Sequence, residues 1–120
     1  MTTEQEIFDK AVQHLLTQKD RSYDRERAIC MYRGPNGLMC GAGPFIKDEA
    51  YTDRMEGKPI GVVVHRWPEA FNVDLTNDRI RAMLTHIQSI HDNVPIPHWR
   101  QRLEDMADTF GLTFNPPVAA

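Results

Sequence analysis

The sequence predicts an α+β fold in which helices dominate. Apolar residues recur at helical spacing in one N-terminal and two C-terminal segments, and β-prone residues flank a glycine- and proline-rich turn between them. Of the 120 residues, 41% are hydrophobic. A chain of this length buries roughly two thirds of the surface that its unfolded form exposes, so it needs neither a metal nor a disulfide to fold. We expect one globular domain over residues 1–114 and an extended tail over residues 115–120.

The N-terminal segment, residues 3–18, is predicted to be a helix. Thr3 lies three residues before Glu6, the spacing of a capping box, in which each side chain accepts a hydrogen bond from the backbone N–H of the other residue. Helical spacing gathers the apolar residues into one stripe, which consists of Ile7, Phe8, Ala11, Val12, Leu15 and Leu16. Residues 20–27 are almost all charged or polar, and we expect a solvent-exposed loop there.

A small β-hairpin is predicted around the Gly-Pro-Asn-Gly turn at residues 34–37. Proline presets the backbone for the first turn position, and the final glycine can adopt a positive φ. In the expected register, Gly34 lies opposite Leu38 and Tyr32 lies opposite Cys40.

Two middle segments give weaker signals. Residues 44–57 predict a short helix or two turns. Residues 60–67 are open between strand and helix, because three consecutive valines favour a strand while a short apolar run also suits a buried helix.

The C-terminal third predicts two helices that form an antiparallel helical hairpin. Thr76 is the expected N-cap of the first helix, Pro97 starts the second, and Gly111 caps its end. The apolar stripe of the first helix consists of Ile80, Met83, Leu84, Ile87 and Ile90. That of the second consists of Trp99, Leu103, Met106, Ala107 and Phe110.

The charge balance excludes some classes of partner. Fourteen Lys and Arg residues against 17 Asp and Glu residues give a net charge of -3, which provides no general attraction to a phosphate backbone or an anionic membrane. Non-specific nucleic-acid binding is therefore disfavoured. No apolar run reaches the roughly 18 residues of a membrane span, and the first residues are too polar for a secretory signal. Two cysteines suit a reducing compartment, so we expect a cytoplasmic protein.

Several short motifs carry a resemblance to a known family. Cys30-Met31-Tyr32-Arg33-Gly34 is followed by Gly37-Leu38-Met39-Cys40, Ile46-Lys47-Asp48-Glu49 and Met55-Glu56-Gly57. The sequence resembles a family of small bacterial and phage proteins of uncharacterised activity, whose members carry Cys-x-Tyr-Arg-Gly, Gly-Leu-Lys-Cys, Ile-Pro-Asp-Glu and Met-Glu-Gly in this order. The match extends to His91-Asp92 and Trp99. Met39 and Lys47 depart from the family pattern. The resemblance implies a cytosolic, phage-borne protein and brings no catalytic residue with it.

Cys30 and Cys40 are candidates for a metal site or a disulfide. A zinc site needs two further ligands, and no histidine pair has the spacing of a zinc finger. In the expected hairpin the two thiols lie diagonally at roughly 7 to 8 Å, beyond the usual reach of a disulfide. We expect two reduced, buried thiols, no metal and no cofactor.

The predicted binding surface consists of Tyr32, Arg33, Asn36, Arg66 and Trp67. Arg33 offers a bidentate donor beside exposed backbone N–H groups of a glycine-rich turn, which suits a phosphate or carboxylate. His65-Arg66-Trp67 combines cations with a stacking surface. The alternative is that the turn is only scaffold, that Arg33 pairs with a carboxylate of the chain, and that Trp67 packs in the core.

The dipeptide His91-Asp92 is also found in the metal site of HD-type hydrolases. That chemistry needs further His and Asp ligands, and His86 and His91 lie about 140° apart around a helix. His91 is explained more simply as a residue that complements the dipole at the end of its helix. Ser22 and Ser89 lack a nucleophile motif, and neither cysteine has the context of an activated thiolate.

Three functional hypotheses follow. The first is a non-catalytic binding protein, such as a phage-derived modulator of a host protein, because the chain is small and acidic and lacks a catalytic signature. The alternative is a protein that binds a small ligand or nucleotide, with a phosphate group bound at Arg33. The second alternative is a metal-dependent hydrolase built on His91-Asp92. The oligomeric state stays open.

Overall fold

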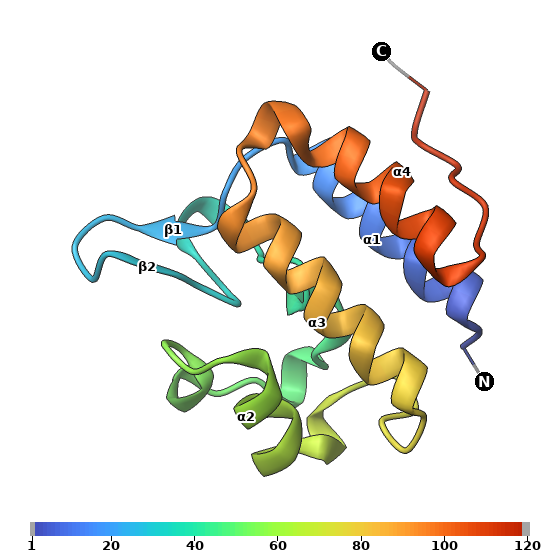
Figure 1. Ribbon diagram of the computed structural model, residues 1–120. Coiled ribbons are helices and arrows are strands. Elements are labelled where there is room, and N and C mark those ends of the chain that lie inside the picture. The colour runs from blue at the N-terminus through green and yellow to red at the C-terminus, as the bar shows by residue number, and fades with distance from the viewer. Residues whose placement is uncertain (1, 119–120) are drawn as a thin grey trace.

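The computed structural model describes residues 2–118 of the chain. Within these residues it has four α-helices and one two-stranded antiparallel hairpin (Figure 1). The elements are α1 (Glu4–Gln18), β1 (Tyr23–Asp24), β2 (Ile29–Cys30), α2 (Ile60–Arg66), α3 (Asp78–Asn93) and α4 (Trp99–Phe110). The prediction of a mostly helical α+β fold is confirmed.

The helices pack around α3. It contacts α4, α1 and α2, and α1 also contacts α4 along its length (Figure 1). α3 and α4 run antiparallel, as predicted. Their shared core is filled by large side chains that are fully buried, among them Phe8, Leu15, Phe45, Met83, Ile87, Trp99 and Leu103. The predicted apolar stripes therefore face this core, with Leu16 and Phe110 half-buried at its edge.

The helix ends follow the predicted signals with two exceptions. Pro97, the expected start of the last helix, lies in a 3-10 turn at Ile96–His98, and α4 begins two residues later at Trp99. The capping box of α1 is present, because the Glu6 N–H donates to Thr3 Oγ1 at 3.1 Å and the Thr3 N–H donates to Glu6 Oε1 at 3.0 Å. Gly111 ends α4 with a φ of +69°. The predicted N-cap of α3 is wrong by one residue: Asn77 accepts from two backbone N–H groups of the first turn, while the Thr76 hydroxyl donates to Asp74.

The regular hairpin lies earlier in the chain than predicted. β1 falls inside residues 20–27, where we expected a loop, because the Asp24 carboxylate accepts from the backbone N–H groups of Glu26 and Arg27 and so stabilises a tight turn. Around residues 34–37 the predicted register is present, with the Gly34 N–H donating to Leu38 O at 2.8 Å. There the ladder is reduced to one bridge between Arg33 and Met39.

The ladder at residues 30–43 stops because side chains take its backbone donors. The N–H groups of residues 32, 33, 39 and 42 donate to side-chain acceptors, and so does the N–H group of Ser22, just before β1. The acceptors are His91 for Ser22, Glu56 for Tyr32 and Arg33, Gln18 for Met39 and Gln88 for Ala42. This irregular segment is therefore held by side chains of α1, α3 and the Met-Glu-Gly stretch.

The ambiguous middle segments are now defined. Residues 60–66 form the helix α2, with Val63 buried and Val62 40% exposed. Residues 44–57 contain short 3-10 turns in place of a regular helix. No helix within residues 2–118 has the length and apolar character needed to cross a membrane. Residues 115–118 of the predicted tail have no regular secondary structure, and residues 119–120 lie outside the described residues.

Candidate functional site

A fully buried imidazole lies at the C-terminal end of α3. His91 Nε2 accepts a hydrogen bond from the Ser22 backbone N–H at 2.9 Å, and Nδ1 lies 2.6 Å from Asp92 Oδ1. A ring nitrogen that accepts carries no proton, so the hydrogen-bond pattern assigns the proton of the neutral ring to Nδ1, which donates it to Asp92. His91 lies in the last turn of α3, where the helix-dipole explanation expects it, and it also joins α3 to the start of the hairpin.

Asp92 collects the donors around this imidazole. Its carboxylate accepts from His91 Nδ1 and from Gln88 Nε2 at 3.2 Å, and the Cys30 thiol lies within 4.8 Å of it. Burial, followed by the negative charge of the nearby Asp92, raises the pKa of Cys30 to about 11. The Asp92 side chain itself keeps 29% of its area exposed. It is therefore the member of the cluster that combines charge with access to solvent.

The order of these groups does not suit nucleophilic catalysis. A Cys-His nucleophile needs the imidazole to accept the thiol proton, whereas here both ring nitrogens of His91 are engaged, Nε2 by the Ser22 N–H and Nδ1 by Asp92. The raised pKa keeps the thiol protonated at neutral pH. The cluster lowers, rather than raises, the reactivity of Cys30.

The same tautomer argues against a metal centre. One ligand atom each from Cys30, His91 and Asp92 lie within 4.8 Å of one another, a spacing that a metal could bridge. A metal on Nδ1 would move the ring proton to Nε2, where it would face the Ser22 N–H at 2.9 Å. Metal binding would therefore require the buried His91–Ser22 bond to break, so the donor set fits a structural joint better than a metal centre.

Both thiols should react slowly in the native protein. A pKa of about 11 in place of 9.0 leaves about 100-fold less thiolate on Cys30 at neutral pH, and burial raises the pKa of Cys40 to about 12. We expect iodoacetamide to modify native Cys30 about 100-fold more slowly than a free thiol, and Cys40 more slowly still. In urea, intact mass should show two alkylated cysteines. Rapid alkylation of the native protein, or a mass two units low before alkylation, would contradict the assignment of two protonated thiols.

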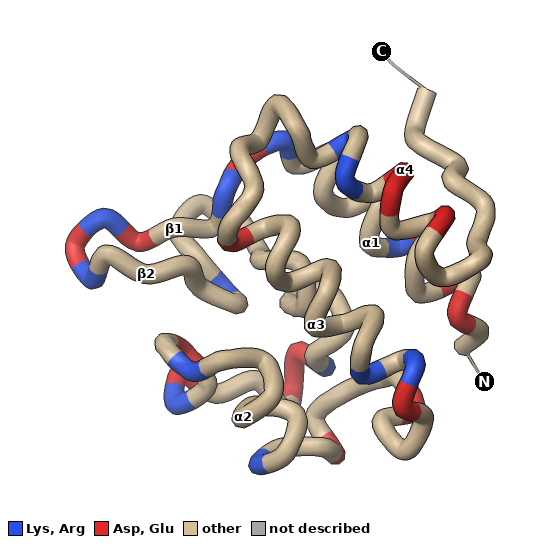
Figure 2. The backbone as a smooth tube through the Cα atoms, in the orientation of Figure 1, with Lys and Arg blue, Asp and Glu red and all other residues tan. Residues whose placement is uncertain are grey.

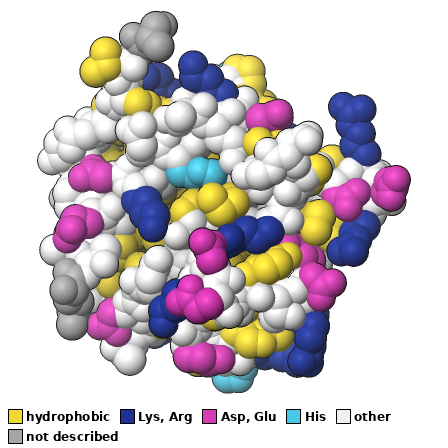
Figure 3. Space-filling view, turned by 180° about the vertical axis from the view of Figure 1, so that it is seen from behind, with side chains coloured by type: hydrophobic (Ala, Val, Ile, Leu, Met, Phe, Trp, Pro, Cys, Tyr) yellow, Lys and Arg dark blue, Asp and Glu magenta, His cyan; other side chains and the backbone are white. Residues whose placement is uncertain are grey.

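A hollow of about 820 Å³ opens beside this cluster, between the hairpin, the turn at residues 35–38 and the end of α3. Its charged lining residues are Asp20, Asp24, Glu26 and Asp92 against Arg21 and Arg25, an excess of two negative charges. Figure 2 shows both signs of charge at the tip of the hairpin, which projects from the helices. In the view from behind, charged side chains again gather at that edge of the molecule (Figure 3). Tyr23, 40% exposed, adds an aromatic ring to the hollow.

Two of the predicted binding residues are engaged inside the protein. Tyr32 is 3% exposed and its hydroxyl donates to Lys58 O at 2.6 Å. The Arg33 guanidinium donates to Gly43 O, Ile46 O and Asp48. These bonds fasten residues 43–48 to the turn and engage both terminal nitrogens of the guanidinium, while Nε is buried without a hydrogen-bond partner among the described residues.

The other predicted residues lie at two places. Asn36 lines the hollow, on a left-handed backbone with a φ of +59°. Arg66 and Trp67 lie at the end of α2, where the guanidinium of Arg66 is 4.8 Å from the Trp67 ring centre. Lys58 connects this end to Tyr32, because its backbone accepts from Tyr32 and its ammonium lies 6.0 Å from the Trp67 ring centre. The structure thus links Tyr32 with Trp67 through Lys58 and places Asn36 in the hollow.

The sequence analysis missed Glu56 and underestimated His91. The buried Glu56 carboxylate accepts from the N–H groups of Tyr32 and Arg33 and from the Tyr51 hydroxyl at 2.6 Å. No local sequence pattern predicts that Glu56 accepts these hydrogen bonds. His91 did carry a signal, because it lies four residues after Ile87 on the apolar face of its helix, and that position predicts burial.

Comparison with known proteins adds no further assignment. The chain matches no protein-family model, no curated protein and no solved structure in these comparisons. The function is therefore argued from the geometry of the hollow and of the cluster beside it.

Proposed function

We propose that the protein is a non-catalytic, cytoplasmic binding protein that engages a protein partner through the hollow beside its hairpin. The observation that carries this proposal is the partly exposed Asp92 carboxylate in a hollow with an excess of two negative charges and an exposed Tyr23. Tyrosine is among the residue types enriched at protein interfaces, and charge complementarity steers a partner of opposite sign. The expected partner surface therefore presents lysine or arginine.

The chemistry of the cluster supports binding over catalysis. Cys30 is held protonated and His91 uses both ring nitrogens within the protein, so neither is prepared for a reaction. On the resemblance to bacterial and phage proteins, we propose a host protein as the partner and modulation of that protein as the role.

Photo-crosslinking tests this proposal. A photoreactive amino acid in place of Arg25, at the exposed tip of the hairpin, should crosslink one protein in a bacterial lysate, whereas the same group in place of Gln101 on α4 should not. With the captured protein purified, Tyr23→Ala should weaken binding about tenfold, since exposed aromatic anchors commonly contribute this much. Asp92→Asn should weaken binding and reduce its salt dependence.

Two outcomes would contradict the proposal. One is crosslinking that is equal from positions 25 and 101. The other is a captured protein whose affinity is unchanged by both Tyr23→Ala and Asp92→Asn, with circular dichroism showing that both variants are folded. Native mass spectrometry of the purified protein separates the alternative, because a retained small molecule with no protein partner would favour ligand binding.

A further inference from the structure

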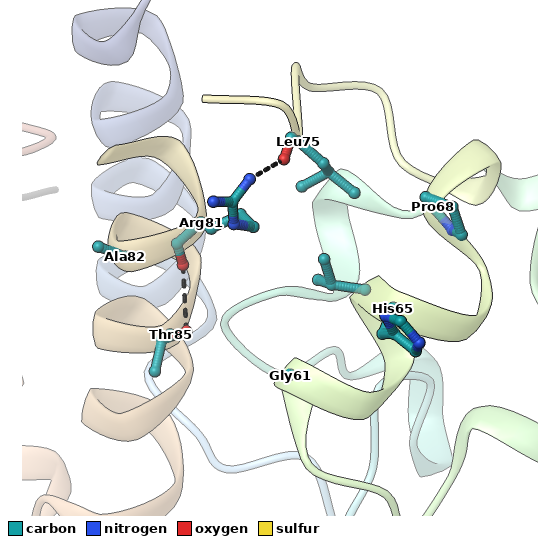
Figure 4. A pocket seen from close by; sticks show the side chains of 8 residues that line it. Gly61, His65, Pro68, Leu75, Arg81, Ala82 and Thr85 are labelled. Atoms are coloured by element: carbon teal, nitrogen blue, oxygen red, sulfur yellow. Dashed lines mark hydrogen bonds between the residues drawn. The ribbon is translucent and has the colours of Figure 1, made fainter. Parts of the chain in front are cut away.

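A second concave surface lies away from the hollow, between α2 and α3. It encloses about 620 Å³, a size typical of small-molecule sites. Figure 4 shows the residues of its two walls: Gly61 and His65 belong to α2, while Arg81, Ala82 and Thr85 belong to α3. It shares no lining residue with the hollow, so it is a separate candidate site.

The lining of this groove is mostly apolar. Val64, Pro68, Leu75 and Ala82 contribute aliphatic surface, and a side chain built on Gly61 would meet no atom within 4 Å. Val64 and Leu75 are only partly buried, although both pack against the core. The groove therefore offers open space and partly exposed apolar walls, which favours a ligand with an apolar body.

One charged side chain, that of Arg81, is found among the described residues that line the groove. Its guanidinium donates to the backbone carbonyl of Leu75, which holds it at the groove (Figure 4). It also pairs with Asp78. The Asp78 side chain is 90% exposed, and such exposed pairs are screened by water and contribute little. A ligand carboxylate can replace Asp78 at small cost and gain a charge-assisted hydrogen bond beside the apolar walls.

We propose that the groove between α2 and α3 binds a small organic acid, with an apolar body between Val64 and Leu75 and a carboxylate at Arg81. This site is independent of the proposed protein-binding hollow. The acid enters as the anion, since the one formal charge of the lining is positive. His65 and Thr85 also line the groove and supply polar atoms. Their hydrogen bonds would select among acids that differ in the polar groups near the carboxylate.

Two matched probes test the proposal, 4-phenylbutyrate and its neutral amide, 4-phenylbutyramide. In ¹H–¹⁵N spectra of the full chain, 4-phenylbutyrate should shift the backbone N–H signals of Gly61, Ala82 and Thr85. It should bind about tenfold more tightly than 4-phenylbutyramide. Arg81→Gln should reduce the affinity for 4-phenylbutyrate about tenfold, to the affinity measured for 4-phenylbutyramide. The affinity for 4-phenylbutyramide should not change. Arg54→Gln, at an exposed arginine that lines neither the groove nor the hollow, is the control for loss of a positive charge elsewhere.

A blocking variant keeps the test independent of folding defects. Gly61 lines the groove, and a Cβ built there meets no atom within 4 Å, so Gly61→Leu raises helix propensity and should fold. The added side chain should narrow the groove and lower the affinity for both probes. The proposal is overturned if the shifts map to other residues, if the wild type binds both probes equally, or if Arg81→Gln leaves the affinity for the carboxylate unchanged. It is also overturned if the same amides shift with protein concentration alone, because a second copy of the chain would then cover the groove.

Discussion

Replacing Trp99 with alanine should lower the free energy of unfolding by about 3 to 5 kcal/mol, the largest single effect expected in this chain. Trp99 is the first residue of α4, is 1% exposed, and donates from Nε1 to Val94 O at 2.9 Å. Its ring also packs near the His91 ring and below the Arg21 guanidinium. Alanine would leave a cavity where α3, α4 and the start of the hairpin meet.

Urea denaturation followed by circular dichroism measures this loss. Trp67→Ala is the matched control, because Trp67 is only half-buried at the end of α2 and should cost clearly less. Equal losses at the two positions, or a negligible loss at Trp99, would be incompatible with the packing described here. They would make Trp99 a candidate for a surface binding residue.

Replacing His91 with alanine should cost about 3 to 4 kcal/mol for a different reason. The substitution leaves the buried Ser22 N–H without an acceptor and takes one donor from Asp92, in addition to opening a cavity. The measurement is again the free energy of unfolding in urea. Because His91 connects α3 to the hairpin through hydrogen bonds, the loss of unfolding free energy should be the same with and without added zinc.

Zinc provides the discriminating control for the His91 prediction. Equimolar zinc should leave the unfolding midpoint of the wild type unchanged, since the His91 tautomer opposes metal binding. If zinc raises that midpoint and His91→Ala abolishes the rise, the metal-centre hypothesis replaces the structural one.

The parts of the fold that were predictable from sequence are those encoded locally. The capping box of α1, the apolar stripe of α3 and the glycine cap of α4 all lie within a few residues of the elements that they define. The one-residue error at Thr76 arose because two neighbouring residues both have side chains that suit an N-cap. The helical pair at the C-terminus followed from the short connection between two strong patterns.

The middle of the chain was not predictable because its contacts are remote in sequence. Ser22 and His91 are 69 residues apart, and Tyr32 and Glu56 are 24 apart, so no local period reveals either bond. The candidate surface depends on the same contacts. Tyr32 has a side chain suited to binding, yet its burial follows from where its segment docks. Asn36 was placed on a turn from sequence, and the hollow that it lines became visible only in the structure.

The side-chain acceptors that hold the segment from Ser22 to Ala42 have a consequence for its motions. An amide protected by a backbone ladder exchanges its hydrogen when that ladder opens, but these amides depend on carboxylate, imidazole and carboxamide groups that belong to other elements. The segment therefore cannot loosen at one amide without breaking a contact to α1, to α3 or to Glu56. Hydrogen exchange at these amides will occur in a shared opening event. A substitution on a helix that removes one of these acceptors will therefore first increase hydrogen exchange in the segment from Ser22 to Ala42, which contains no α-helix.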